Sequence, residues 1–110
     1  MQFYLLNGIA VFAQNSFTYT NPISSGIDGG IRDAQIFVEG DFYYLIGTSP
    51  PFWGGPNPGV RIFSSKDILN WKFEKLLISR SDMDSSVWHF DRFWAPEIHK
   101  INSKYYLLFN

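Results

Sequence analysis

The residues of this chain that could do chemistry are a few carboxylates and an unusual number of aromatic rings. Asp33 follows Arg32 just before an apolar run, where its carboxylate could face a substrate, cap a turn or pair with Arg32. Aromatic residues make up 19% of the sequence and include four Trp, among them Trp53 and Trp94. Tyr and Phe suit pleated sheets, which explains part of this excess. Stacking on sugar rings is one further use for it.

Other common kinds of site have no support in the sequence. The absence of cysteine excludes disulfides, thiolate zinc sites and a cysteine nucleophile. His89 and His99 are too isolated to propose a metal triad, and Asp82 and Asp84 lack the other ligands of an EF-hand loop. Gly-rich nucleotide loops and serine-hydrolase elbows are missing. Nine Lys and Arg against ten Asp and Glu, without a basic block, argue against nucleic acid as a partner. We predict no metal or cofactor site.

Short β-type runs separated by Gly, Pro, Asn and Ser predict an all-β fold. The predicted strands are residues 34–38, 42–47, 60–64 and 71–78. The first two flank a turn at residues 39–41 and form a hairpin signature. A loop over residues 48–59 contains four prolines, three glycines and Trp53, and residues 65–70 form the last turn. The strands therefore follow one another in up-and-down order.

An internal repeat indicates the architecture. Each residue of one pattern recurs after 62 positions: Ile36, Tyr43, Tyr44 and Leu45 return as Ile98, Tyr105, Tyr106 and Leu107. A four-stranded unit that repeats at a fixed period is typical of a β-propeller, whose blades bury their apolar faces against one another. Closing a ring takes four or more blades. The chain offers one blade and the first hairpin of a second, so we expect it to be part of a longer protein.

Several motifs together resemble glycoside hydrolase family 43. They are Asn21-Pro22, Arg32-Asp33-Ala34-Gln35-Ile36, Tyr43-Tyr44, Ser64-Ser65-Lys66-Asp67-Ile68-Leu69-Asn70-Trp71 and Trp94-Ala95-Pro96-Glu97-Ile98. Their order and spacing match the opening blade of that family. The family commonly has Asp-Pro where this chain has Asp33-Ala34, which implies a subgroup. The resemblance implies a five-bladed β-propeller, of which this chain holds the first blade and the start of the second.

The resemblance also implies a role for Asp33, as the general base of an inverting hydrolysis. Such a reaction needs a second carboxylic acid to protonate the leaving oxygen. Glu97 is the tempting candidate, but in the family the acid and an auxiliary Asp lie in later blades, beyond Asn110. Glu97 also aligns with Gln35, two positions past Asp33, and even steps keep the facing of a strand while moving outward from the pocket. We therefore expect Glu97 to be structural.

Two tryptophans are candidates for substrate binding. The repeat aligns Trp94 with Arg32, so Trp94 should face the central channel as a sugar platform, with packing between blades as the alternative. Trp53 could form a pocket wall or pack under its own loop. Trp71 belongs to a structural turn, and Trp88, Phe90 and Phe93 are expected to be packing or rim residues. Some family members hold an axial calcium or other ion, but this chain lacks the blades that would complete such a site.

The chain divides into three predicted segments. Residues 1–13 are mostly apolar, end in Val11-Phe12-Ala13 and are typical of a signal peptide, although no Lys or Arg precedes Leu5. Residues 14–30 form a polar connector, and residues 31–110 form a partial catalytic propeller. The apolar stretch is too short for a membrane span. We expect a secreted or periplasmic protein.

The predicted function is inverting hydrolysis of glycosidic bonds in plant-type polysaccharides or oligosaccharides, such as arabinan, xylan or galactan side chains. The 110 residues alone are predicted to be inactive, since the acid lies elsewhere. A non-catalytic carbohydrate-binding propeller is one alternative, and a sister propeller hydrolase acting on agar-type oligosaccharides is another. A third is an independently folded β-sandwich module. The sequence does not determine sugar, linkage, or exo or endo action.

Overall fold

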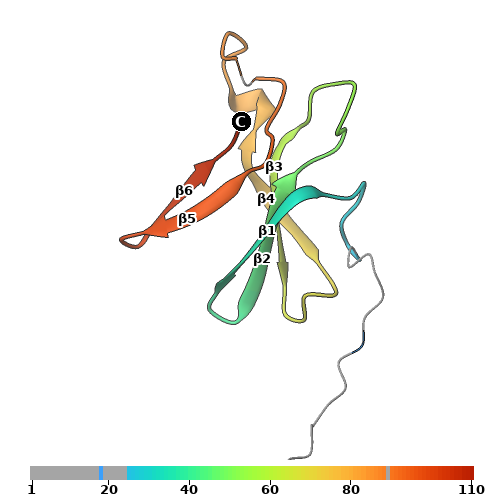
Figure 1. Ribbon diagram of the computed structural model, residues 1–110, viewed down its shortest axis with the longest axis vertical. Helices are drawn as coiled ribbons and strands as arrows, with labels where there is room; N and C mark the ends of the chain where they lie inside the picture. Colours follow the sequence, from blue (N-terminus) through green and yellow to red (C-terminus); the bar gives the residue numbers. More distant parts are fainter. Residues whose placement is uncertain (1–17, 19–24, 89) are drawn as a thin grey trace, which may run out of the picture.

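A computed structural model describes residues 18, 25–88 and 90–110 of the chain (Figure 1). The predicted signal peptide, residues 1–13, lies outside the described residues, as do His89 and most of the predicted connector. Within the described part, no helix has the length and apolar character that crossing a membrane requires.

Four antiparallel strands form the main sheet, in the order β1-β2-β3-β4 (Figure 1). They are β1 (Arg32–Glu39), β2 (Phe42–Thr48), β3 (Gly59–Ser65) and β4 (Lys72–Ser79). This confirms the predicted up-and-down order, and each strand lies where its apolar run predicts it. A short 3-10 helix, η1 (Arg80–Asp82), follows β4 and has no counterpart in the prediction.

The turn between β3 and β4 is held by the side chain of Asp67. Its carboxylate accepts hydrogen bonds from the backbone N–H groups of Leu69 and Asn70, at 2.9 and 2.8 Å, and from the Asn70 amide. These donors favour the charged carboxylate and lower the pKa of Asp67, with the Asn70 side chain as the largest cause. Trp71 follows the turn and is buried, as expected of a structural residue.

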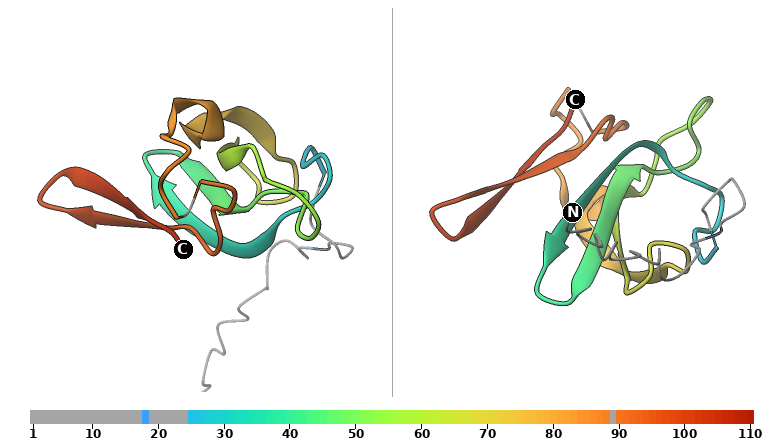
Figure 2. Two further views of the ribbon diagram at one scale, coloured as in Figure 1. Left: turned by 90° about the horizontal axis from the view of Figure 1, so that it is seen from above. Right: turned by 60° about the horizontal axis from the view of Figure 1, so that its bottom comes forward.

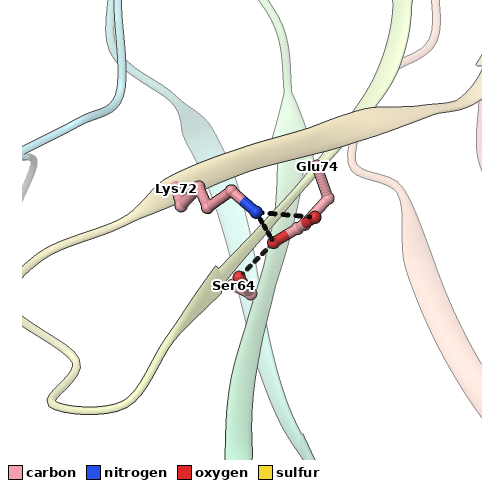
Figure 3. A network of polar contacts seen from close by, with 3 residues as sticks. All are labelled: Ser64, Lys72 and Glu74. Carbon is pink, nitrogen blue, oxygen red and sulfur yellow. Dashed lines mark hydrogen bonds and ion pairs between the residues drawn. The ribbon is translucent and has the colours of Figure 1, made fainter.

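Polar contacts also tie β4 to β3 near this turn (Figure 3). The Ser64 hydroxyl of β3 donates a 2.6 Å hydrogen bond to Glu74 of β4, and the Lys72 ammonium lies 3.2 Å from the same carboxylate oxygen. The Ser64 bond, followed by the Lys72 contact, lowers the pKa of Glu74. Glu74 therefore has a local structural role on the outer strand.

A second sheet repeats the first hairpin. It consists of β5 (Glu97–Ile101) and β6 (Lys104–Leu108), joined by Asn102 and Ser103. Ile98 pairs with Leu107 just as Ile36 pairs with Leu45, so the register is the one that a shift of 62 residues predicts. Backbone hydrogen bonds in both directions between Trp94 and Asn110 extend the repeat beyond the assigned strands, because they match the pairing of Arg32 with Thr48.

The core consists of one apolar cluster on each face of the main sheet. Ile27, Leu45, Phe63 and Trp71 form the first. Ile46, Val60, Ile62 and Phe93 form the second, against which the β5–β6 hairpin packs. Figure 2 shows this hairpin leaning away from the main sheet at one end. Ile27 belongs to the predicted connector, so the end of that segment is part of the core rather than a free linker.

Candidate functional site

A pocket of about 240 Å³ opens where the start of β1 meets the segment before β5. It gathers residues from four separate stretches of the chain: Arg32, Asp33, Thr48, Phe52, Trp53, Trp94, Ala95 and Asn110. All three residues singled out from the sequence, Asp33, Trp94 and Trp53, therefore line the same pocket. Thr48, Phe52 and Asn110 were not singled out.

Asp33 sits at an irregularity in β1. The pairing with β2 slips by one residue between Arg32 and Gln35, as in a β-bulge, and Asp33 has a φ of 51°. Bulges bend a strand and re-aim a side chain, and are common beside active sites. Ala95, the repeat partner of Asp33, also has a positive φ of 43°. A residue with positive φ therefore stands at the start of both blades, and in the first blade this residue is an aspartate.

A buried hydroxyl holds this carboxylate. Thr48 is 3% exposed, and its Oγ1 donates a 2.9 Å hydrogen bond to Oδ2 of Asp33. Oγ1 of Thr48 in turn accepts a 2.9 Å hydrogen bond from the backbone N–H of Ala95. Thr48 therefore links the Asp33 side chain to the first turn of the second blade. The sequence predicts Thr48 in the loop over residues 48–59, and only the pairing of Thr48 with Arg32 in the structure reveals this role.

Arg32 turns towards the aromatic wall of the pocket rather than towards Asp33. Its guanidinium carbon lies 4.8 Å from the centre of the Trp53 ring and 5.7 Å from that of Phe52. The structure shows no ion pair between Arg32 and its described neighbour Asp33. The alternative in which Asp33 simply pairs with Arg32 is thus not the observed arrangement.

The two tryptophans line the pocket with exposed side chains. Trp53 is 72% exposed and Trp94 is 41% exposed. The Arg92 guanidinium lies 5.8 Å from the centre of the Trp94 ring. Phe93 beside it is fully buried in the second core cluster, so it is a packing residue. Of these two neighbours, Phe93 therefore belongs to the core and Trp94 to the pocket.

Glu97 lies outside the residues that line the pocket. Its carboxylate is 3.0 Å from Nε2 of His99, and both side chains are exposed. The expectation from even steps assumes a regular strand, whereas the register of β1 shifts between Arg32 and Gln35 and Asp33 itself has a positive φ. The side chain of Gln35 instead bonds to the backbone of Ile98.

The pocket can position a water molecule or a polar ligand atom against one carboxylate, between aromatic walls. Asp33 is the only acidic residue among those that line it. Among residues 18, 25–88 and 90–110, no three His, Asp or Glu side chains gather in a way that could hold a metal ion. The described residues therefore supply one acid–base group and no partner for it.

Comparisons with known proteins converge on one family. The sequence profile described as "Glycosyl hydrolases family 43" matches residues 19–110. A proposed beta-xylosidase of Escherichia coli (strain K12) is 34% identical over 92 residues, which are 82% of this chain and 16% of that protein. The extracellular exo-alpha-(1->5)-L-arabinofuranosidase ArbA of Cellvibrio japonicus (strain Ueda107) is 30% identical over 87 residues, covering 73% of this chain and 22% of that protein.

A solved structure agrees with these relatives. The native Bacillus subtilis arabinanase Arb43A matches with a TM-score of 0.53 and 26% identity, over 70% of this chain and 26% of that one. The fold is accordingly the first blade and the beginning of the second blade of a five-bladed β-propeller. The chain spans less than a quarter of the length of either curated relative.

Proposed function

The chain belongs to glycoside hydrolase family 43, and on that premise we propose that it supplies the general base of a glycoside hydrolase. The single observation that supports this most strongly is Asp33 itself. It is an exposed carboxylate on a bent strand end, held by Thr48, in a pocket walled by Trp53 and Trp94. Water can reach this group, while the aromatic rings can stack on a sugar.

In the proposed reaction Asp33 takes a proton from a water molecule as that water attacks the anomeric carbon. The leaving oxygen must be protonated by a second carboxylic acid, about 6.5–9.5 Å away in an inverting enzyme. No described residue of the pocket can do this, since Asp33 is its only acid. In keeping with what the family resemblance implies, we place the acid and an auxiliary Asp outside these 110 residues. Trp94 and Trp53 bind the sugar by stacking.

For the substrate we propose plant-type polysaccharides or their oligosaccharides, with arabinan, xylan or galactan side chains as candidates. The names of the relatives support this, because they refer to xylosidase, arabinofuranosidase and arabinanase activities. We further propose that the protein is exported. The extracellular location in the name of the Cellvibrio relative and the apolar residues 1–13 support export.

The test is Asp33→Asn in a complete polypeptide that contains these residues. We expect kcat on aryl arabinosides or xylosides to fall by about 10²- to 10⁴-fold, the usual worth of one acid–base group. Asp41→Asn, in the exposed β1–β2 turn outside the pocket, is the matched control and should keep full activity. Proton NMR of the first-formed product should show an inverted anomer.

A near-normal rate for Asp33→Asn would remove Asp33 from the mechanism. A wild-type protein that binds these sugars without turning them over would instead support the non-catalytic, carbohydrate-binding alternative. Isothermal titration calorimetry, run beside the kinetics, separates these outcomes.

A further inference from the structure

Arg61, near the start of β3, lies outside the residues that line the pocket but bonds to two segments that lead into it. Its guanidinium donates hydrogen bonds of 2.8 and 2.6 Å to the carbonyl oxygens of Asp28 and Gly30. Its Nε donates a 3.1 Å bond to the buried hydroxyl of Ser49. The guanidinium carbon lies 5.1 Å from the centre of the Phe63 ring, on the side of the first core cluster. One side chain therefore joins two segments that are distant in the sequence.

These two segments carry the residues that form the Asp33–Thr48 hydrogen bond. Gly30 comes shortly before Asp33, at the entry to β1, and Ser49 directly follows Thr48 at the end of β2. Thr48 holds the carboxylate of Asp33 itself. Arg61 holds the backbone that leads into Asp33 and the residue that follows Thr48. The pair is thus fixed from both of its strands.

The residue opposite Arg61 in β2 leaves room for this arrangement. Gly47 pairs with Arg61 across the sheet. A Cβ atom added to Gly47 would lie 2.6 Å from the carbonyl oxygen of Arg32 and 2.6 Å from Cγ1 of Ile31. The backbone at the start of β1 therefore lies directly against Gly47, where the register of β1 begins to shift. The missing side chain at Gly47 and the bonds from Arg61 act on the same bend.

We propose that Arg61 is a positioning residue, which fixes the entry into the β1 bulge and thereby the direction of the Asp33 carboxylate. This inference rests on the proposed function of Asp33 as a general base. Asp33 has a φ of 51°, a left-handed conformation that costs energy in a residue with a side chain, so neighbouring structure must hold it. A displacement of about 1 Å at a reacting group can cost about 10²-fold in rate.

An arginine suits this role better than a lysine. The planar guanidinium presents its N–H donors in fixed directions, so it can bond to three acceptors at once, whereas an ammonium group is a compact point charge on a flexible stem. Arg61 is half-buried, which limits the freedom of its stem. Asp28, Gly30 and Ser49 all precede the second hairpin, so every one of these contacts lies within the first blade and the segment that leads into it.

The test uses the complete polypeptide and an aryl glycoside as substrate. Arg61→Gln should lower kcat by about 10- to 100-fold with little change in KM, because the base is misplaced while the aromatic walls stay. Arg61→Lys should fall between Arg61→Gln and the wild type. Gly47→Ala pushes on the start of β1 and should lower kcat in the same way. Lys72→Gln, which removes an exposed cation on β4 outside the pocket, is the matched control and should keep the wild-type kcat.

A double-mutant cycle separates positioning from general damage to the protein. If Arg61 acts through Asp33, adding Arg61→Gln to Asp33→Asn should leave the residual kcat unchanged, because no base remains to be misplaced. Damage to the fold or to sugar binding would lower the residual rate further. Circular dichroism gives the Tm of each variant, and rates are measured below it. If Arg61→Gln is unfolded at the assay temperature, Arg61→Lys takes its place in the cycle.

A wild-type kcat in the Arg61 variant would overturn the inference. An equal fractional loss in the wild-type and Asp33→Asn backgrounds would overturn it as well, since Arg61 would then act independently of Asp33. Both results leave the proposed function intact. A near-normal rate for Asp33→Asn alone would instead overturn the proposed function, and the role of Arg61 with it.

Discussion

Thr48 lies between the Asp33 carboxylate and the backbone of the second blade, and its hydroxyl group forms a hydrogen bond with each of them. Its hydroxyl has one hydrogen, which it donates to Asp33, and it accepts the Ala95 N–H in return. At 3% exposure it offers little surface to a substrate. Within the proposed function, Thr48 is therefore a positioning residue that fixes the direction of the base.

This role predicts a split between kcat and KM in the complete polypeptide. Thr48→Val keeps the volume but removes the hydrogen bond to a charged group, and should lower kcat by about 10- to 100-fold with little change in KM. Thr48→Ser keeps the hydroxyl and should retain most of the activity. Steady-state kinetics on an aryl glycoside measures both. Equal kcat values for the two variants would contradict the role, whereas an active Asp33→Asn would contradict the proposed function itself.

At the level of single residues, the sequence predicted those site residues that the family motifs or the internal repeat single out. Asp33, Trp94 and Trp53 were identified and lie in one pocket, although their roles remain proposals. Thr48 and Phe52 were missed, because each belongs to a segment whose position depends on strand pairing. The bulge at Asp33 was missed for the same reason, since an unpaired residue becomes visible only when both strands are in register.

At the level of elements, the 2.8 Å ion pair between Lys100 of β5 and Glu39 of β1 makes the packing of the second hairpin depend on pH. Hydrogen bonding to Lys100, the largest cause, lowers the pKa of Glu39 below its usual 4.5. A carboxyl group whose pKa is lowered by folding stabilises the folded state at pH values above its usual pKa. This stabilisation is lost as the pH falls through the pKa of the folded state. The contact should therefore weaken below about pH 4.

Hydrogen exchange can detect this loss at one amide. The Ile98 N–H donates to the Gln35 side chain, so its protection reports on the contact between the hairpins. We expect its protection factor, corrected for the intrinsic rate, to decrease between about pH 5 and pH 3. In Glu39→Gln the protection should be lower at pH 5 and flat over this range. A wild-type protection factor that does not change with pH would contradict the prediction.

The elements themselves were predicted well where local pattern decides them. Apolar runs and turn residues located all four strands of the first sheet, and the 62-residue repeat predicted the register of the second hairpin. The polar composition of residues 14–30 gave no sign that Ile27 is buried against Trp71. The segment can approach the backbone of Trp71 because residue 26 is a glycine: any side chain there would collide with the carbonyl oxygen of Trp71. A contact between residues this far apart in the sequence cannot be read from local composition.

At the level of the whole molecule, the pocket holds one carboxylate and the proposed reaction needs two. Mutation of either partner usually costs orders of magnitude in rate, because base and acid act in the same step. The 110-residue chain by itself should therefore show no turnover of an aryl arabinoside or xyloside above the Asp33→Asn control. Stopped assays at high protein concentration would measure this. Turnover by the wild-type chain that Asp33→Asn abolishes would mean that an acid lies within these residues, with Glu97 the first to test by Glu97→Gln.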